Sequence, residues 1–474
     1  MLTGGGRVSE QFDVVVIGGG PGGYAAALYA AAADLSVALV ERDRVGGTCL
    51  HRGCIPAKEL LETASVLRTV KGAAAFGVGG PGGGASVDLA TSMKRKDEVV
   101  GRLWKGLEGL LERRTVRLVT GTGTLTGPGR VAVRGDEGDQ EFRGEAVILA
   151  SGSLPRTIPG FDVDGRLVLS SDEVLAMDDL PATAAVIGGG AIGCEFASLL
   201  ADLGVGVTLL ESLDKILPGC DEAVAAVVRR SFTKRGIDVR TGVQVTGHTP
   251  GGAGTTIALD GGDGVEVERV VVSVGRRPLS DSLGLDGTAV EVDERGFVKV
   301  DQTCRTTAGG VWAVGDLVAT PQLAHVGFAE GITAVRDILG EHPLPVQYDK
   351  VPWCIYCHPE VAFVGHSEES ARRAGFDVVT STHHFRGNGR ALIVGEADGL
   401  VKVVAERAPD GTAGTVLGIH MVGPWVTEQL GQGYLAVNWE AAVGDLAPLV
   451  QPHPTLSEAF GEAAMALTGR GLHG

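Results

Sequence analysis

The sequence has no excess of positive charge and no long apolar run. Among its 474 residues, 41 Lys and Arg are outnumbered by 58 Asp and Glu, for a formal net charge of −17. Phosphate backbones and anionic lipids attract clustered cations, so we expect neither nucleic acid nor a membrane as a partner. A membrane-spanning helix needs about 18 consecutive apolar residues, and no stretch of the sequence reaches that length.

Cysteines are also few. The seven are scattered along the chain and odd in number, which argues against the disulfide framework of a small secreted protein. The first residues, MLTGGGRVSEQ, lack the apolar core of a signal peptide. We therefore expect a cytoplasmic protein, in which two cysteines close in sequence serve catalysis rather than cross-linking.

Glycine, by contrast, is abundant, with 74 residues, about twice the usual share. At this density a GxGxxG spacing arises by chance, so the surrounding pattern has to decide. In residues 13–41 a β-branched run precedes Gly18, Gly20 and Gly23, an alanine-rich helical stretch follows, and a second strand ends at Glu41. This order predicts a βαβ unit whose helix N-terminus binds a pyrophosphate and whose terminal acid accepts hydrogen bonds from ribose hydroxyls.

The same unit recurs in residues 184–211, around Gly188, Gly190 and Gly193, with Glu211 at the offset that Glu41 has in the first unit. The repeat predicts two nucleotide-binding domains; the alternative is two glycine-rich turns that happen to precede surface acids. A carboxylate at Glu211 would repel the extra phosphate of NADP, and no arginine follows it directly. The second domain is therefore expected to prefer NAD.

Cys49 and Cys54 lie in the stretch GGTCLHRGCIPAK, residues 46–58. Four intervening residues allow a disulfide if the local backbone permits it. Pro56 fits the first turn of a helix, which places Cys54 near a helix N-terminus whose dipole favours a thiolate. The alternative is a pair of reduced, buried cysteines without a redox role.

This stretch resembles the redox signature of the class I pyridine nucleotide–disulfide oxidoreductases. Further stretches resemble the family in the family's own order: GGGPGGY (18–24), GGGAIGCEFA (188–197), VGRRP (274–278), GVWAVGD (310–316), IYCHPEVAFVG (355–365) and HPTLSEAF (453–460). The resemblance implies an α/β fold with two Rossmann-like domains, for FAD and NAD, and a C-terminal α+β dimerisation domain. The implied boundaries are 1–151 for the FAD domain with the redox pair, 152–279 for the NAD domain, 280–349 for a central domain completing the FAD site, and 350–474 for dimerisation.

The resemblance also implies roles for single residues. Cys49 is expected to exchange with the disulfide substrate and Cys54 to face the flavin, with Lys58 nearby and paired with Glu195. His453, oriented by Glu458, is expected to be the acid–base for thiol chemistry, which needs a proton acceptor near neutral pH; in this family it reaches the cysteines of the other subunit, so a homodimer is implied. The residues expected to hold FAD are Gly18, Gly20, Gly23, Glu41, Gly47, Thr48, Gly315 and Asp316, the last at the ribityl chain. Those expected to hold NAD are Gly188, Gly190, Ile192, Gly193, Glu211 and Gly275.

No metal site is expected. Cys354 and Cys357 form a CxxC, but they lie in a predicted strand, where residues three apart point to opposite faces. Shared ligation or a disulfide between them is therefore disfavoured, and we expect both to be structural.

Within the family, the chain most resembles the branch that oxidises protein-bound dihydrolipoamide to lipoamide and reduces NAD⁺ to NADH. This branch implies a partner, either the lipoyl domain or acyltransferase core of a 2-oxoacid dehydrogenase complex or a glycine-cleavage lipoyl carrier. Two alternatives stay open: an NAD(P)H-dependent reductase of another small disulfide, and a flavoprotein subunit that acts mainly by docking.

The sequence departs from the family pattern near both catalytic groups. His51 and Arg52 replace the more usual Asn-Val between the cysteines, and Gln451 and Pro452 stand where His-Ala is common before the histidine. No catalytic group is lost. His51 and Arg52 add positive charge near the thiols, so the redox potential and the thiol pKa are expected to differ from the values typical of the family.

Overall fold

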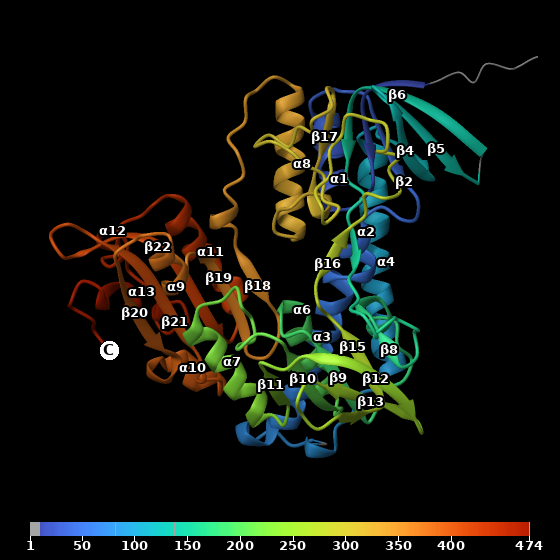
Figure 1. The fold of residues 1–474 in the computed structure, drawn as a ribbon. Coiled ribbons are helices and arrows are strands. Elements are labelled where there is room, and N and C mark those ends of the chain that lie inside the picture. Colours follow the sequence, from blue (N-terminus) through green and yellow to red (C-terminus); the bar gives the residue numbers. More distant parts are fainter. Residues whose placement is uncertain (1–9, 81, 137, 474) are drawn as a thin grey trace, which may run out of the picture. The chain divides into compact units, whose positions relative to one another are not determined.

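The computed structural model describes residues 10–80, 82–136 and 138–473 (Figure 1). Residues 1–9 lie outside this range. They make up most of the N-terminal segment that was expected not to be a signal peptide. The chain divides into two units, each considered by itself below. The first contains residues up to 60, 90–156 and 275–348, and the second contains residues 61–89, 157–274 and 349 onward.

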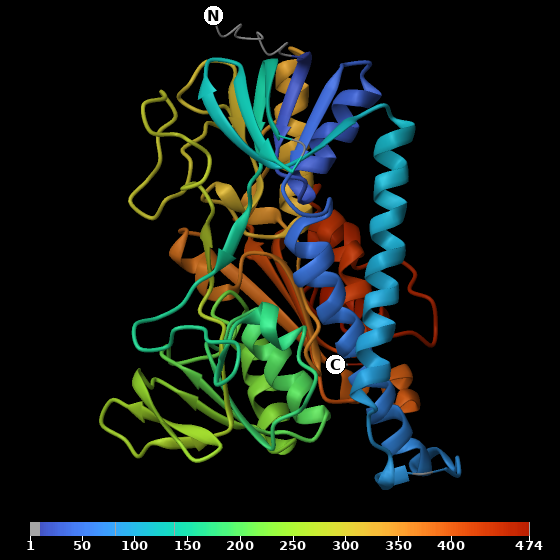
Figure 2. The same cartoon turned by 90° about the vertical axis from the view of Figure 1, so that its right-hand side faces the viewer.

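The first unit is built on a seven-stranded sheet (Figure 2). Its parallel part runs in the order β3 (Arg117–Thr120), β2 (Val37–Glu41), β1 (Glu10–Ile17), β6 (Gly138–Leu149) and β17 (Val311–Ala313), and β5 (Arg130–Gly135) and β4 (Thr122–Gly127) extend β6 antiparallel. The middle of β1 is apolar on both faces, with Val14, Val15 and Val16 fully buried, as a sheet covered on both sides requires. Ile17 pairs with both Val40 and Leu149, so the carboxyl ends of these strands lie at one edge.

The helices of this unit are α1 (Pro21–Ala32), α2 (Gly47–Arg52), the start of α3 (Cys54–Gly72), α4 (Leu89–Arg113) and α8 (Ala324–Ile338). α1 follows β1 directly and packs against α8 (Figure 1). β17 joins the sheet from a distant part of the sequence, in keeping with the predicted role of residues 280–349 in completing the first nucleotide site. β7 (Ser153–Pro155), which follows β6 in the sequence, forms a two-stranded antiparallel pair with β16 (Arg276–Pro278).

The second unit repeats the same strand order. Its parallel sheet runs β11 (Asp238–Thr241), β10 (Gly206–Glu211), β9 (Thr183–Ile187), β15 (Arg269–Val272) and β8 (Val168–Leu169), with α6 (Ala191–Asp202) after β9 and α7 (Glu222–Lys234) after β10. An antiparallel trio, β12 (Val245–Gly251), β13 (Gly254–Leu259) and β14 (Val265–Val267), follows β11 in sequence. The repeat read from the sequence is thus present as two sheets in which equivalent strands have equivalent neighbours.

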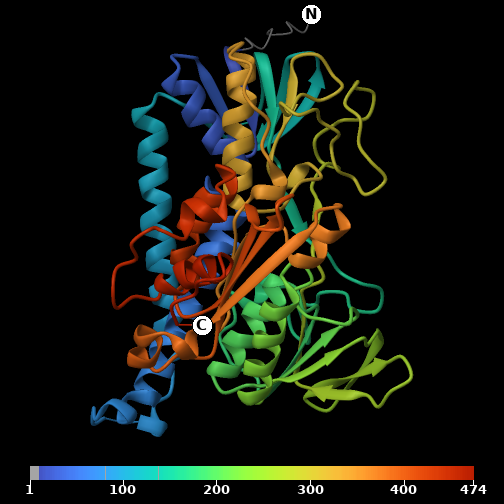
Figure 3. The same ribbon diagram turned by 90° about the vertical axis from the view of Figure 1, so that its left-hand side faces the viewer.

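A five-stranded antiparallel sheet forms the rest of the second unit (Figure 3). Its order is β18 (Trp353–Ile355), β19 (Glu360–Gly365), β22 (Ala413–Gly423), β21 (Leu400–Arg407) and β20 (Val378–His384), and the helices α9 (Glu368–Arg373), α10 (Gly389–Val394), α11 (Val426–Asn438), α12 (Val443–Leu446) and α13 (Glu458–Ala466) accompany it. Ile419 and Met421 of β22 pack in one buried cluster with Phe460 of α13. The predicted fold class, two Rossmann-like domains followed by an α+β domain, is confirmed. The four exact domain boundaries remain a prediction.

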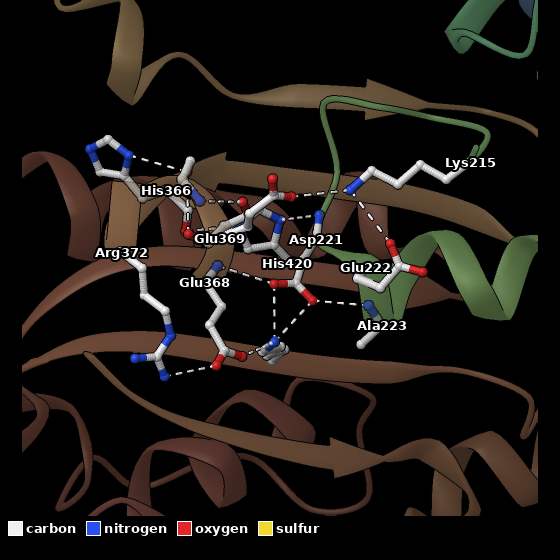
Figure 4. Close-up of polar contacts among 12 residues, drawn as sticks. Lys215, Asp221, Glu222, Ala223, His366, Glu368, Glu369, Arg372 and His420 are labelled. Atoms are coloured by element: carbon white, nitrogen blue, oxygen red, sulfur yellow. Dashed lines mark hydrogen bonds and ion pairs between the residues drawn. The ribbon is translucent and has the colours of Figure 1, made fainter. Parts of the chain in front are cut away.

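Buried polar residues link the α7 region to this antiparallel sheet (Figure 4). Asp221 caps the N-terminus of α7 and accepts two 3.0 Å hydrogen bonds from Lys402 Nζ, which also reaches Glu368 at 2.7 Å. His420 is fully buried; its Nε2 donates to the carbonyl of His366 at 3.0 Å, so its Nδ1 accepts from the N–H of Asp221 at 3.4 Å. Burial lowers the pKa of His420 from its usual 6.5 to about 4, so the ring is neutral at physiological pH.

Among the residues that the structure describes, no helix combines the length and the apolar character that a membrane crossing requires.

The neutral His420 predicts a loss of stability in mild acid. Because the folded-state pKa lies below the unfolded value, its contribution is complete above pH 6.5 and is lost as the pH falls toward 4, on the order of 3 kcal/mol at the acid end. Asp221, whose pKa is also lowered, adds to the loss only below about pH 4. We expect His420→Gln, whose amide can donate to His366 without titrating, to flatten the dependence of the melting temperature on pH between 6.5 and 4.5. The matched variant His384→Gln, at an exposed histidine of β20, should keep the native slope; equal slopes for both variants would contradict the assignment.

Candidate active site

The first glycine loop joins β1 to α1 and packs too closely for side chains at two of its three positions. Gly18 has φ +107°, and a Cβ there would lie 2.2 Å from the carbonyl oxygen of Ala150. A Cβ on Gly23 would lie 1.8 Å from the carbonyl oxygen of Gly18. A Cβ on Gly20 would meet nothing within 4 Å. The first and third glycines therefore hold the turn, and the second leaves open space at the helix N-terminus, where a pyrophosphate is bound in this type of loop.

The second glycine loop, between β9 and α6, has the same geometry. Gly188 has φ +105° and would place a Cβ 2.5 Å from the carbonyl oxygen of Ser273, and a Cβ on Gly193 would lie 1.8 Å from the carbonyl oxygen of Gly188. Gly190 again has no protein atom within 4 Å of its Cβ position. Ile192, expected at the nicotinamide, lies partly buried in the first turn of α6. Both loops fit the phosphate groups of a dinucleotide.

The acid after each loop has a local partner that the sequence did not reveal. Glu41 Oε2 accepts a hydrogen bond from the N–H of Gly19 at 2.7 Å, and its Oε1 accepts from Asp43 at 2.9 Å. Glu211 Oε2 accepts from Gly189 at 2.6 Å, and its Oε1 accepts from Leu213 at 2.8 Å. Each carboxylate thus braces its own glycine loop. Two carboxylate oxygens offer about four acceptor sites, so capacity remains for the ribose hydroxyls that both acids are expected to bind.

Asp316 lies at the end of β17, on the same edge as the first glycine loop. Gly315 has φ +71° and opens the short turn Gly315–Leu317. Asp316 Oδ2 accepts a hydrogen bond of 2.5 Å from Ser153 Oγ, which itself accepts one of 2.7 Å from Arg276 Nε. Sequence analysis missed Ser153 and Arg276 as partners of Asp316, although Arg276 lies in the VGRRP stretch. Gly275, expected at the NAD site, precedes Arg276 in the first unit and has φ +102°.

The loop that carries the cysteines is fastened to the first glycine loop. The N–H of Gly46 donates to the carbonyl of Gly19 at 2.7 Å, and a Cβ on Gly47 would lie 2.7 Å from Gly20 Cα. These contacts fix the start of α2, in which Thr48 is half-buried. Gly47 therefore lies next to Gly20, and the contact of Gly47 and Thr48 with FAD remains a prediction.

Cys49 and Cys54 are brought together by the turn from α2 to α3. Both are partly buried. A hydrogen bond to Cys54, together with burial, raises the pKa of the Cys49 thiol far above its usual range, and Lys58 only partly offsets this. The proton is therefore held on Cys49. The division of roles between the two cysteines remains a prediction.

Tyr24 is a neighbour of the cysteine pair that sequence analysis missed. It lies on α1, its ring contacts Phe328 at a centroid distance of 5.5 Å, and burial followed by negative charge on Cys49 and Cys54 raises its pKa to about 12. The phenol is therefore neutral and available as a donor near the sulfurs. Its position in the GGPGGY stretch is the only signal in the sequence.

His51 and Arg52 point toward the loop before α2. His51 Nε2 lies 2.9 Å from the carbonyl oxygen of Val45, and its ring meets Trp104 edge-on at 6.1 Å. Arg52 forms an exposed ion pair with Asp43 at 2.9 Å. The extra positive charge expected from Arg52 is thus largely offset by a neighbouring carboxylate.

His453 and Glu458, the predicted acid–base pair, are in contact within the second unit. His453 Nδ1 lies 2.8 Å from Glu458 Oε1, and Glu458 Oε2 accepts a 2.7 Å hydrogen bond from the N–H of Thr455. Burial acts to raise the pKa of Glu458, but the hydrogen bonds from Thr455 and His453 outweigh it and lower the pKa. The carboxylate stays ionised and fixes the imidazole through Nδ1, leaving Nε2 for proton transfer; the His453 side chain is 78% exposed.

Lys58 and Glu195 belong to different units, and their pairing remains a prediction. Within the second unit, the Glu195 carboxylate is buried and accepts a hydrogen bond from the N–H of Tyr356 at 2.9 Å. The reach of His453 to the cysteines of a second subunit also remains a prediction.

The pyridine nucleotide-disulphide oxidoreductase family matches residues 12–331, and the dimerisation domain of the same family matches residues 351–464. The chain belongs to this family. The prediction made from the motifs is confirmed, and the dimerisation domain supports a homodimer.

Relatives of this chain match over nearly their whole length. Dihydrolipoyl dehydrogenase of Bacillus subtilis is 40% identical, covering 98% of this chain and 100% of the relative, and that of Thermus scotoductus is 39% identical, covering 98% and 99%. Among solved structures, LpdA of Mycobacterium tuberculosis has a TM-score of 0.89 at 28% identity, covering 97% of this chain and 99% of the other. The flavoprotein disulfide reductase RclA of Escherichia coli has a TM-score of 0.84 at 26% identity, covering 96% and 99%.

The two glycine loops predict a reciprocal pair of variants. Gly20 and Gly190 have backbone angles that alanine adopts without strain, so a methyl group there would intrude only on the approaching phosphates. We expect Gly190→Ala to weaken NADH binding about tenfold or more with flavin content unchanged, and Gly20→Ala to lower flavin retention while NADH binding to the flavin-bearing fraction is preserved. Fluorescence titration with NADH and the flavin-to-protein absorbance ratio measure the two effects. Equal effects of both variants on both cofactors would contradict the assignment of one loop to each.

The His453–Glu458 pair predicts a loss of dithiol turnover. Glu458→Gln keeps the shape of the partner but removes its negative charge, so we expect turnover of the dithiol substrate to fall roughly 10- to 100-fold. Steady-state rates with the dithiol substrate test this, with Glu462→Gln on the same helix as control. Native turnover in Glu458→Gln would exclude Glu458 as the catalytic partner of His453.

Proposed function

We propose that this protein is a dihydrolipoyl dehydrogenase, which oxidises protein-bound dihydrolipoamide to lipoamide and reduces NAD⁺ to NADH. The observation that carries the proposal is the fastening of the hydrogen-bonded Cys49–Cys54 pair to the first nucleotide loop, through Gly46 and Gly47. This arrangement ties dithiol chemistry to a bound cofactor. Relatives named for this activity match the chain from end to end.

Dithiol oxidation begins with the pair in its disulfide form. His453, contributed by the second subunit of a homodimer, takes a proton from the first substrate thiol at Nε2, while Glu458 stabilises the imidazolium. The substrate thiolate attacks Cys49 Sγ, the bond to Cys54 breaks, and Cys54 leaves as a thiolate. The second substrate thiol then attacks the substrate sulfur of the mixed disulfide, which releases lipoamide and returns a proton to Cys49.

Two cofactors are needed to restore the Cys49–Cys54 disulfide after each turnover. FAD and NAD supply the two-electron path from the dithiol to NADH. Gly18, Gly20, Gly23 and Asp316 would hold FAD, and Gly188, Gly190 and Gly193 would hold NAD. The hydrogen bond that keeps the proton on Cys49 leaves Cys54 as the electron-rich sulfur. The high pKa of Tyr24 keeps a neutral phenol beside it.

NAD rather than NADP is proposed as the acceptor. Glu211 is buried, and its carboxylate is held at the end of β10 by the N–H groups of Gly189 and Leu213. A 2′-phosphate would approach a fixed negative charge there, whereas a 2′-hydroxyl can donate to it.

Partners and location follow from the proposed activity. The substrate is a lipoyl group carried by a protein, so we propose transient docking to the lipoyl domain or acyltransferase core of a 2-oxoacid dehydrogenase complex, or to a glycine-cleavage lipoyl carrier. We propose that the chain resides in the cytoplasm. The reductase of another disulfide has weaker support, since RclA is 26% identical against 40% for the Bacillus subtilis enzyme.

Anaerobic turnover distinguishes these functions. We expect purified protein to reduce NAD⁺ with dihydrolipoamide, and Cys49→Ser to lose at least about 1,000-fold in rate, because serine cannot form the mixed disulfide. Cys354→Ser, at a partly buried cysteine of β18, is the matched control and should keep native turnover. NADPH-dependent reduction of glutathione disulfide by a protein inactive with dihydrolipoamide would instead establish the alternative. Absence of both activities in the native protein would leave only the docking role.

A further inference from the structure

Glu330 is a fully buried carboxylate next to the first nucleotide site, and no step described so far uses it. It lies on α8 and is 0% exposed. Its Oε2 accepts a hydrogen bond from the N–H of Gly315 at 2.6 Å, and its Oε1 accepts one from the hydroxyl of Tyr348 at 2.9 Å. Both donors are neutral. Gly315 directly precedes Asp316, so the carboxylate is bonded to the turn that presents the Asp316 side chain.

Close helix packing fixes where Glu330 stands. A Cβ on Gly331 would lie 2.5 Å from the carbonyl oxygen of Gly22, and one on Gly327 would lie 3.2 Å from the N–H nitrogen of Gly22. The two glycines that flank Glu330 on α8 thus rest against the first turn of α1, and the helices run side by side (Figure 1). α1 carries the glycine loop. The position of the Glu330 carboxylate is therefore set relative to both elements of the FAD site.

Within the described part of the chain, Glu330 has no ion pair with a lysine or arginine, so its buried charge needs a compensating role. Removing a carboxylate from water is unfavourable, and neutral donors, the Thr320 side chain among them, recover only part of the cost. Burial accordingly raises the pKa of Glu330 to about 6, with a smaller contribution from the nearby Asp316. An apolar residue would fill the same space without this penalty, but it would leave the N–H of Gly315 buried without an acceptor. The hydrogen bond to Gly315 is thus what the carboxylate provides.

We propose that Glu330 is a positioning residue for FAD, which holds the Gly315–Asp316 turn so that Asp316, tied to Ser153, faces the sugar-alcohol chain of the flavin. This inference rests on the FAD site of the proposed function and is independent of the disulfide substrate. Asp316 is held from two sides: Ser153 orients its side chain, and Glu330 orients its backbone. Loss of the second contact frees the turn and speeds release of the cofactor.

Flavin retention in the purified holoenzyme tests the proposal. Release is followed by the rise in flavin fluorescence after dilution, and the visible absorption band of the bound flavin reports its surroundings. We expect Glu330→Ala to release FAD roughly 10- to 100-fold faster, because a buried donor is left unpaired beside the site. Glu330→Gln should stay within about threefold of native, since its amide oxygen can still accept from Gly315 and its NH₂ group can face the Tyr348 oxygen.

Two further variants separate positioning from general stability. Tyr348→Phe removes the other hydrogen bond and should leave release nearly native. Asp337→Ala removes a second buried carboxylate of α8, which binds Trp312 and Arg305 rather than the turn. This variant should lower the melting temperature without faster release of FAD.

If Glu330→Ala fails to fold, Glu330→Asp takes its place. It keeps the charge but moves the acceptor away from Gly315, so it should release FAD faster than Glu330→Gln. Native release from Glu330→Ala, or release from Glu330→Gln as fast as from Glu330→Asp, would overturn the proposal. Neither FAD release nor the melting temperature depends on turnover of dihydrolipoamide, so the result is independent of the test of the substrate.

Discussion

The contact between the cysteine loop and the first glycine loop is the constraint on which the catalytic chemistry depends. A hydrogen bond from Gly46 to Gly19 and the close approach of Gly47 to Gly20 leave no space for a side chain at position 47. The thiols are therefore attached to the backbone that receives the cofactor rather than to a separate surface. Redox exchange between sulfur and a cofactor requires this fixed separation, and glycine at position 47 permits it.

The acids that end β2 and β10 combine a structural role with the expected role in nucleotide binding. Glu41 and Glu211 each accept a hydrogen bond from the middle of a glycine loop and a second from the residue two positions on. A loop rich in glycine loses much conformational entropy on folding, and an anchoring carboxylate offsets part of that loss before any nucleotide arrives. Ribose binding by these acids then uses acceptor sites that are already oriented. Preorganisation and recognition are thus properties of one side chain.

The sequence predicted structural features that are local or repeated, but it did not predict contacts between side chains from distant segments. Two βαβ units, the pair of sheets and the cysteine pair follow from periodicity and spacing within about thirty residues. Ser153, Arg276 and Glu330 converge on Asp316 and Gly315 from three other segments, and nothing in their local sequence indicates a shared site. The direction of a side chain is equally hidden: Arg52 was expected to act on the thiols, but its ion pair with Asp43 depends on a turn whose shape only the structure reveals.

The buried acids of the two units show how placement decides what a charge does. Asp221 has Lys402 within 3.0 Å, and the pKa of its carboxyl is lowered, so the group contributes to the junction between α7 and the antiparallel sheet as an ion pair. Glu330 has only neutral donors, and its pKa is raised. An unpaired carboxylate weakens the fold in which it is buried, so stability alone does not account for it. Its Oε2 accepts from the backbone of the turn that carries Asp316. A requirement for a fixed backbone at that turn therefore explains why a carboxylate is buried at this position of α8 despite its cost to stability.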